Sequence, residues 1–320
     1  MTLPRLAALS LLSTLAAAGC GAITDGRATE REARAEARYP PTGRLIEVAG
    51  RTVHADQRGS GPDVVLIHGA SGNTRDFTFA LADVLAREFR VTAFDRPGLG
   101  WSDPAGEAGI SPLVQAEILR AAAAEMGIRR PVVVGHSYGG AVAMAWALGD
   151  PGGTGAVVSL AGATMPWPGG LGPWYTLASS DLGGATVIPL ISAFVPERRA
   201  GSAIATIFAP DPVPEGYADY VGAGLTLRRE TLRTNARQVN GLKPYLQRMS
   251  AAYPDLALPV EIVHGTADEI VPHKVHAGPM AELLPDARLT LIEDAGHMIH
   301  HSRPDAVIAA IRRAATRAAR

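Results

Sequence analysis

The chain has 320 residues and a formal net charge of -1, with 47% hydrophobic and 19% charged residues. This composition can bury a sizeable core, so it excludes a disordered chain, and the balanced charge argues against nucleic acid as a partner. Aromatic residues make up 5%, too few for a base-stacking surface, and the single cysteine, Cys20, excludes an intrachain disulfide.

The first twenty residues are typical of an export signal. Arg5 precedes an uncharged apolar run over residues 6–18, and Gly19 and Cys20 follow. The run is too short to cross a bilayer comfortably as a mature helix. Residues 17–20, Ala-Ala-Gly-Cys, resemble a bacterial lipoprotein processing box, although leucine is usual where Ala17 stands. We expect residues 1–20 to be a signal peptide with a lipobox. Cys20 would then be the lipidated first residue of an exported, membrane-anchored protein on the periplasmic face.

Two alternatives remain at this terminus, namely plain secretion to the periplasm or medium, and an apolar N-terminus that is not cleaved. Residues 21–41 are rich in Arg, Glu and Ala and end in Pro40-Pro41. We expect this segment to be a solvated, partly helical tether without a chemical role.

Apolar strands and helices alternate from residue 42 onward. A hairpin is predicted where residues 45–48 and 52–55 flank Ala49-Gly50. Further strands are predicted at 64–67, 91–94, 132–134 and 156–160, with helices at 77–89 and between Ser111 and Gly127. This alternation predicts the α/β class, with a mostly parallel central sheet flanked by helices on both faces.

The alternation stops after Gly162. Residues 163–255 are rich in Pro, Gly and aromatic residues, with short helical pieces such as 225–239. The strand–helix pattern returns with strands at 260–263 and 288–292, a helix around 275–284 and a last helix from Pro304. The sequence therefore predicts an α/β core formed by residues 42–162 and 256–320, interrupted by a helical cap over 163–255.

The sequence Gly135-His136-Ser137-Tyr138-Gly139 follows the apolar strand 132–134 and precedes a helix. This G-x-S-x-G pattern, in a strand–turn–helix context, predicts a sharp turn that exposes the Ser137 hydroxyl. A free serine hydroxyl is a poor nucleophile, so the site also requires a base and an acid that orients it.

Two further groups lie at the ends of predicted strands, where open α/β sheets hold their ligands. Asp268 follows strand 260–263, and His297 follows strand 288–292. We expect His297 to be the general base and Asp268 to fix its tautomer. Glu269 competes for the role of the acid, and His300 and His301 compete for that of the base. No metal site is expected, because the adjacent histidines lack the spacing of a helical zinc motif.

A small-residue loop, His68-Gly69-Ala70-Ser71-Gly72, follows the strand at 64–67. Its backbone can approach a substrate oxygen closely. We expect the backbone N–H groups of Ala70 and Tyr138 to form an oxyanion hole.

Together these motifs resemble those of the α/β-hydrolase family, over roughly residues 42–317. The resemblance includes the loop Asp95-Arg96-Pro97-Gly98-Leu99-Gly100-Trp101-Ser102, which is similar to that of capped members such as epoxide hydrolases and haloalkane dehalogenases. Those enzymes carry an aspartate nucleophile where this chain has Ser137. The resemblance therefore implies a serine hydrolase, in which Asp95 shapes a loop. It implies no cofactor.

We expect the substrate to be a small or medium apolar molecule with a carboxylic ester or related acyl bond. C–C hydrolysis of meta-cleavage products and cofactor-free haloperoxidase or perhydrolase chemistry are alternatives, as is a non-catalytic ligand-binding lipoprotein. The expected cap pocket draws on aromatic residues of the insertion: Trp167, Trp174, Tyr175, Phe194, Phe208, Tyr217 and Tyr220. The oligomeric state is left open.

Overall fold

The computed structural model describes the backbone of residues 3–319 and the side chains of residues 20–199 and 201–319. Residues 1–2 of the expected signal peptide lie outside this range. The eight strands are β1 (Arg44–Val48), β2 (Arg51–Arg58), β3 (Asp63–Ile67), β4 (Arg90–Phe94), β5 (Val132–His136), β6 (Ala156–Leu160), β7 (Val260–Gly265) and β8 (Ala287–Ile292).

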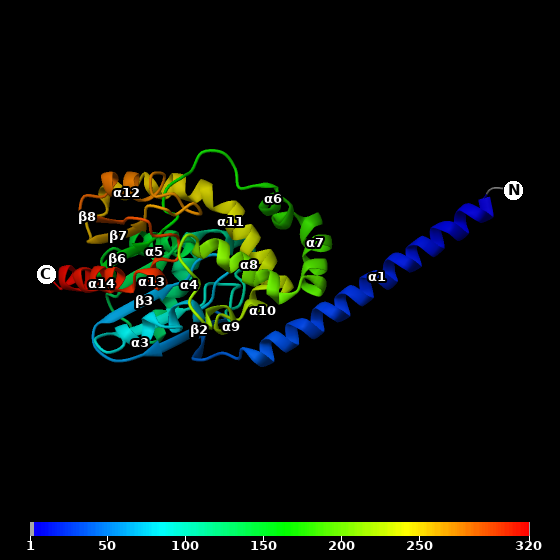
Figure 1. Ribbon diagram of the computed structural model, residues 1–320, viewed down its shortest axis with the longest axis horizontal. Coiled ribbons are helices and arrows are strands. Elements are labelled where there is room, and N and C mark those ends of the chain that lie inside the picture. The colour runs from blue at the N-terminus through cyan, green and yellow to red at the C-terminus, as the bar shows by residue number, and fades with distance from the viewer. Residues whose placement is uncertain (1–2, 320) are drawn as a thin grey trace.

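The strands form one mostly parallel sheet, as the sequence predicts, and their order is β1-β2-β4-β3-β5-β6-β7-β8 (Figure 1). Only β2 runs antiparallel, to both β1 and β4. The other pairs are parallel; Val64 of β3, for example, pairs with Val91 of β4 and Val132 of β5. The parallel strands are short apolar runs because both of their faces are covered.

Helices cover both faces of the sheet, and neighbouring strand residues point to opposite sides. Val65 packs with the layer of α4 (Pro112–Glu125), α5 (Tyr138–Gly149) and α12 (Ala277–Leu283). Val64 packs with the layer of α2 (Arg75–Thr78), α3 (Leu81–Leu85) and α14 (Pro304–Ala318). The helix predicted over 77–89 is thus α2 and α3, which are separated at Ala80, where φ is -151°.

A helical cap is inserted between β6 and β7. It consists of α6 (Pro173–Ser179), α7 (Asp181–Phe194), α8 (Glu197–Phe208), α9 (Tyr217–Tyr220), α10 (Ala223–Thr226) and α11 (Arg229–Ser250). The helical piece predicted over 225–239 corresponds to α10 and the first half of the longer α11. Short helix α13 (Ile299–Ser302) follows the loop after β8.

Residues 21–38 differ from the solvated tether that the sequence predicts. They are the second half of α1 (Leu3–Arg38), and this half packs against the cap (Figure 1). Ala28 and Ala35 are 0% and 4% exposed. These alanines lie seven residues apart on one face of the helix, so they form an apolar stripe within a charged segment.

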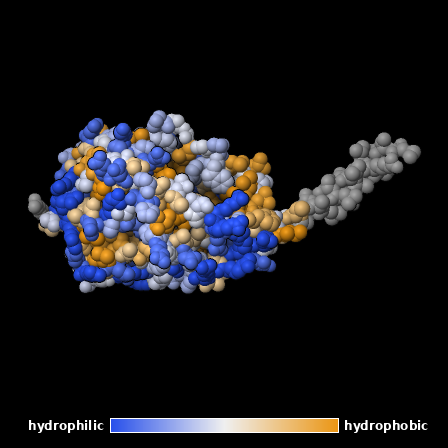
Figure 2. Space-filling model, viewed as in Figure 1, coloured by the Kyte–Doolittle hydropathy of each residue, from blue (hydrophilic) through white to orange (hydrophobic). Residues whose placement is uncertain are grey.

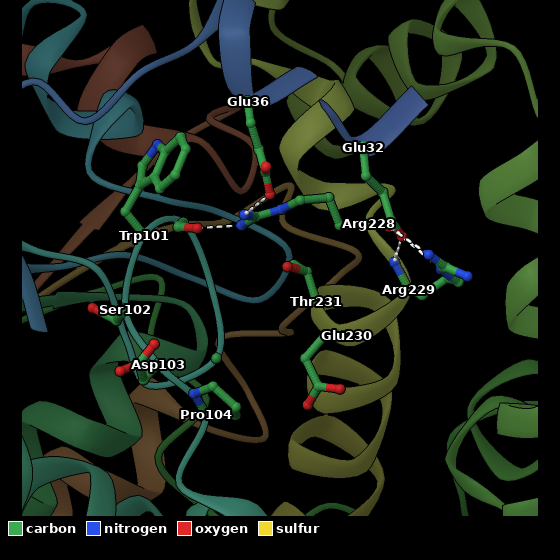
Figure 3. Close-up of a pocket in the computed structure, with 12 residues that line it drawn as sticks. Glu32, Glu36, Trp101, Ser102, Asp103, Pro104, Arg228, Arg229, Glu230 and Thr231 are labelled. Carbon is green, nitrogen blue, oxygen red and sulfur yellow. Dashed lines mark hydrogen bonds and ion pairs between the residues drawn. The ribbon is translucent and has the colours of Figure 1, made fainter. Parts of the chain in front are cut away.

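Acidic side chains of α1 reinforce this contact. Figure 3 shows Glu36 reaching Arg228, and Glu32 reaching Arg229 at the start of α11. The nitrogen–oxygen distances are 3.1 Å and 2.8 Å. Arg228 also donates to the carbonyl oxygen of Gly100. Two of the charges that suggested a solvated segment are therefore paired with arginines of the cap, and one of these arginines also contacts a loop of the core.

Candidate active site

Ser137 lies at the turn between β5 and α5. Its φ of 54° and ψ of -121° place a non-glycine residue in a strained region, and its side chain is largely buried. The turn is held by the backbone, because Ser137 N donates to Leu160 O at 3.0 Å and Ala163 N donates to Ser137 O at 3.0 Å. Strain that the surroundings maintain in this way is typical of functional turns.

The glycines on either side of Ser137 are required by close backbone approaches. A Cβ atom at Gly135 would lie 2.1 Å from Gly139 O, and one at Gly139 would lie 2.1 Å from Ile67 O. Either contact would force the backbone to shift. The glycine pattern read from the sequence therefore has a steric cause: it lets α5 begin directly against β3.

Asp268 and His297 come together from the ends of β7 and β8. His297 Nδ1 lies 2.8 Å from Asp268 Oδ2, and both side chains are buried. The other carboxylate oxygen accepts hydrogen bonds from Ile270 N and Val271 N, each at 2.9 Å. The competing acid, Glu269, is exposed and has no hydrogen bond to His297 among the described residues.

The Asp268 carboxylate is stabilised in its charged form. Burial by itself would raise its pKa, but hydrogen bonds from His264 and His297 and from the Val271 backbone hold the pKa well below its usual range. His264 Nε2 lies 3.2 Å from Asp268 Oδ2 and 2.7 Å from Val271 O. His264 and His297 therefore contact the same carboxylate oxygen of Asp268.

Ser137 and His297 line the same cavity, together with Gly69 and Ala70 of the loop after β3. Within the part of the chain that the structure describes, no hydrogen bond joins the two side chains. Catalytic hydrogen bonds of this kind often form or shorten only when substrate is bound. The structure thus brings the three predicted side chains to one edge of the sheet, with the acid–base contact already formed.

The expected oxyanion donors are on the two sides of this site. Ala70 lines the cavity, and Tyr138 is the first residue of α5, where backbone N–H groups have no partner within the helix. A Cβ atom on neighbouring Gly69 would lie 3.0 Å from Ser137 Cβ, so the β3 loop closely approaches the serine. Ser71, next in this loop, has a φ of 58°.

A buried arginine contacts the two parts of the chain that carry the expected oxyanion donors. Arg96 is fully buried, donates to the carbonyl oxygens of His68 and Gly69, and lies 4.2 Å from the centre of the Tyr138 ring. Burial lowers the pKa of Arg96 to about 10, although the electrostatic interaction with Tyr138 acts to raise it. Its neighbour Asp95 accepts hydrogen bonds within its own loop and from the hairpin, in keeping with the expected loop-shaping role.

The two remaining candidates for the base, His300 and His301, face a different group. Both Nε2 atoms contact Asp76 Oδ1, at 3.1 Å and 2.9 Å, and Tyr217 donates its hydroxyl to the same oxygen at 2.8 Å. Burial lowers the pKa of His300 to about 4, so this ring is neutral near pH 7. The ligand atoms of Asp76, His300 and His301 lie within 4.8 Å of one another, close enough to hold a cation, and hydrogen bonds account for their placement.

The cavity at Ser137 has a volume of about 470 Å³, within the range of small-molecule sites. Its wall is mostly apolar, and α7 and α8 contribute Ile191, Ile204 and Ile207. Of the aromatic residues expected from the sequence, Trp174, Tyr175 and Tyr217 line this cavity. Trp167, Phe194, Phe208 and Tyr220 are not among the described residues that line it.

Sequence reasoning missed three residues that shape the site. The sequence indicates Arg96 only as part of the loop at 95–102 and predicts no role for His264 or Asp76. Their partners lie up to 225 residues away, so no local pattern indicates these contacts. The one available signal is position, because His264 closes an apolar strand that leads to Asp268.

The comparisons with known proteins agree with this fold. A family model described as "Alpha/beta hydrolase family" matches residues 64–310. An uncharacterized protein of Mycobacterium tuberculosis is 30% identical over 277 residues, which cover 79% of this chain and 76% of that protein. Haloalkane dehalogenase 2 of M. tuberculosis is 24% identical over 288 residues, or 85% of this chain and 94% of its own.

Solved structures share the fold at low sequence identity. An esterase from Rhodococcus sp. ECU1013 matches with a TM-score of 0.67 and 22% identity, over 85% of this chain and 97% of its own. A bacterial membrane phospholipase A matches with a TM-score of 0.66 and 21% identity, over 98% of this chain and 99% of its own. The second match is long enough to include α1.

Proposed function

The chain belongs to the α/β-hydrolase family, and we propose that it is a serine hydrolase that cleaves a carboxylic ester or related acyl bond. One observation carries the proposal. The Asp268–His297 hydrogen bond of 2.8 Å opens onto the same cavity as Ser137, a serine held in strained backbone between a strand and a helix.

In the proposed reaction, His297 accepts the proton of the Ser137 hydroxyl while the serine oxygen attacks the carbonyl carbon of the ester. Asp268 orients His297 and stabilises its charged form. The backbone N–H groups of Ala70 and Tyr138 receive the negative charge that develops on the carbonyl oxygen. Protonated His297 then gives its proton to the leaving alcohol, and an acyl-enzyme remains. Water that His297 activates releases the acid and restores Ser137.

The volume and the apolar lining of the cavity favour a small to medium, largely apolar acyl ester. A volume of about 470 Å³ accommodates such a molecule, and the isoleucine side chains of α7 and α8 offer it few polar partners. A region of 116 residues is 32% identical to the 2-hydroxy-6-oxononadienedioate/2-hydroxy-6-oxononatrienedioate hydrolase of Cupriavidus pinatubonensis. That enzyme's reaction is therefore the second candidate and belongs in the same screen.

The test is hydrolysis of p-nitrophenyl esters of graded chain length by the wild type and by Ser137→Ala. We expect Ser137→Ala to lose about four orders of magnitude or more in turnover and to lose labelling by a fluorophosphonate. Ser250→Ala, at the far end of α11, is the matched control and should behave as the wild type. Equal rates for Ser137→Ala and Ser250→Ala would exclude the mechanism. Turnover of a meta-cleavage product without ester hydrolysis would favour the second candidate.

We also propose that the protein is exported and attached to a membrane through a lipidated Cys20. Cys20 is exposed, and the docked half of α1 begins directly after it. The measurement is labelling of the expressed protein with an alkyne fatty acid, which Cys20→Ala should abolish. Labelling that persists in Cys20→Ala would contradict the lipid site, and recovery of all wild-type protein in the soluble periplasmic fraction would contradict the attachment.

A further inference from the structure

The cap exposes a group of large apolar side chains near α1. Residues 163–195 carry a single charged residue, Asp181. Five apolar side chains of α6 and α7, here called the cap face, are 41–72% exposed: Trp174, Leu177, Leu182, Leu190 and Phe194. Figure 2 shows hydrophobic atoms gathered at this end of the molecule, beside the base of α1. Soluble proteins usually scatter such residues singly, so a cluster of them marks an interaction surface.

The polar groups around the cap face are already satisfied within the protein. Thr186, between Leu182 and Leu190 on the exposed side of α7, donates its hydroxyl to Leu182 O at 2.7 Å. Ser180 donates its hydroxyl to Leu177 O at 2.7 Å. Asp181 pairs with Arg237 of α11 at 2.8 Å. Because these groups have internal partners, the face can leave water at little cost in lost hydrogen bonds.

Helix α1 continues this apolar surface toward the N-terminus. Arg27 Nε donates to Ala193 O at 3.0 Å, which fixes α1 against the end of α7. Ile23 is 67% exposed, and the sequence has no charged residue from Leu6 to Thr24. At about 1.5 Å per residue, Cys20 is only about 10 Å along the helix from Arg27. An anchor at or before Cys20 would therefore hold the cap face at the surface of a membrane.

Basic side chains flank the same face. A groove of about 570 Å³ between α1 and the start of α8 is lined by Arg27, Arg31, Arg34 and Arg38, together with Phe194 of the cap face. Glu197 is the one acidic residue in this lining. Apolar residues bordered by arginines match the boundary between the acyl chains and the anionic headgroups of a bilayer.

We propose that the cap face docks on an anionic lipid bilayer, with α7 lying along the interface at the base of α1. The opposite side of α7 is packed inside the protein, where Ile188 and Ala193 are buried. One exposed apolar side and one packed side are what an interfacial helix requires.

Among the residues that the structure describes, none of the single helices has the length and apolar composition to cross a membrane. The bent pair of α6 and α7 meets both criteria together, with an angle of 101° between its halves.

Docking also specifies where the substrate comes from, and this part rests on the proposed function. Trp174 belongs to the cap face and also lines the cavity at Ser137. Tyr175 and Ile191, which are outside the cap face but on the same two helices, line the cavity too. The cavity therefore adjoins the docked surface. Acyl esters held in the bilayer would reach Ser137 along this wall, so the expected substrate class is lipid esters.

The test uses tryptophan as a depth probe in the full-length protein bound to vesicles of phosphatidylcholine and phosphatidylglycerol with brominated acyl chains. In a Trp174→Phe background, a tryptophan is introduced by Leu190→Trp on the cap face or by Leu291→Trp on β8. The two leucines are similarly exposed, at 50% and 44%. Helix α7, which carries Leu190, and strand β8, which carries Leu291, lie on opposite sides of the folded core in Figure 1. We expect bromine to quench the fluorescence added by Leu190→Trp and to leave that added by Leu291→Trp unchanged.

Quenching of neither probe would show that the face stays in water, and equal quenching of both would show non-specific adsorption. Either result overturns the proposal. The readout does not require turnover, so failure of docking and failure of the proposed function are distinguishable. In a second measurement, Leu182→Asp with Leu190→Asp should lower hydrolysis of an ester embedded in vesicles by roughly tenfold or more. Its hydrolysis of a soluble short-chain ester should match that of Leu291→Asp.

Discussion

Asn235 of the cap holds the backbone of Ser71 in the core. Its side-chain oxygen accepts the Ser71 N–H at 2.7 Å, and its amide donates to Ser71 Oγ at 3.0 Å. Ser71 adjoins Ala70, the proposed oxyanion donor, and has a φ of 58° that needs outside support. The cap therefore holds the loop of the core that carries Ala70, in addition to covering it.

Asn235→Ala should lower kcat by roughly 10- to 100-fold, because the loop that carries Ala70 would no longer be held in register with the developing oxyanion. KM should change little, since few contacts with the ground-state substrate are lost. Asn235→Asp keeps the accepting oxygen and should retain more activity. The control is Asn240→Ala on the same helix, whose side chain donates to Ser179 Oγ. Equal kcat values for Asn235→Ala and Asn240→Ala would contradict the role.

Arg96 should be one of the most sensitive positions for stability. Its guanidinium is fully buried and donates to Gln115 Oε1 at 3.0 Å, to Gln238 Oε1 at 2.7 Å, and to backbone carbonyls of the β3 loop. Arg96→Met leaves these oxygens buried without donors and should lower the free energy of unfolding by roughly 3 kcal/mol or more. Urea unfolding measures this.

Comparison of Arg96→Lys with Arg96→Met separates the effect of the charge from that of the hydrogen-bond donors. Arg96→Lys keeps the charge but replaces five planar donors with three at one point, so it cannot reach all four oxygens. We expect it to be destabilised nearly as much as Arg96→Met. A stability within about 0.5 kcal/mol of the wild type would show that charge alone, and not the fork of donors, holds the loop.

The contact between α1 and the cap is tested by a double-mutant cycle on Glu32 and Arg229. Burial by itself would raise the pKa of Glu32, but hydrogen bonds from the Arg229 side chain and backbone hold it below its usual value. We expect a coupling of about 1 kcal/mol between Glu32→Gln and Arg229→Gln in urea unfolding. The exposed pair Glu88–Arg312, which joins the turn before β4 to α14, should couple more weakly. Equal coupling in the two pairs would mean that α1 is not docked in solution.

Most of the core could be predicted from the sequence because its strands are short apolar runs bounded by glycine or polar residues. The strand predicted at 64–67 lies within β3, and the one at 156–160 coincides with β6. The division of helix 77–89 into α2 and α3 could not be predicted, because no proline or glycine interrupts the segment and the break depends on the backbone at Ala80. The docking of α1 depends on arginines of α11 that are nearly 200 residues away.

The candidate site, like the fold, could be predicted only in part. Ser137, Asp268 and His297 could be identified because each follows an apolar strand, and parallel strands end at one edge of the sheet. Their catalytic roles stay predictions until variants are measured. Asp76 and Asn235 have no local signature, since their partners, on α9 and α13 and in the loop after β3, are distant in sequence and meet them only in the folded molecule. Neither the partners of His300 and His301 nor the support from the cap could be read from the chain.

Buried histidines predict a loss of stability in mild acid. Burial lowers the pKa values of His68, His276 and His300 from 6.5 to about 4, because the charged rings would be desolvated. Between pH 6.5 and 4 the unfolded chain binds protons that the folded chain does not, so the free energy of unfolding must fall as pH falls. Asp76 and Asp268 have lowered pKa values, so their stabilising contribution persists down to pH values below 3.8 and does not offset this loss.

Urea unfolding at pH 7 and pH 5 should therefore show a loss on the order of 1–2 kcal/mol for each such histidine. His276, whose Nδ1 accepts a hydrogen bond from Met165 N at 3.1 Å, offers the matched variant. His276→Gln keeps an acceptor but cannot titrate, so its stability should fall less between pH 7 and pH 5 than that of the wild type. The same pH dependence in both proteins would show that His276 is already protonated, or already exposed, in the folded state.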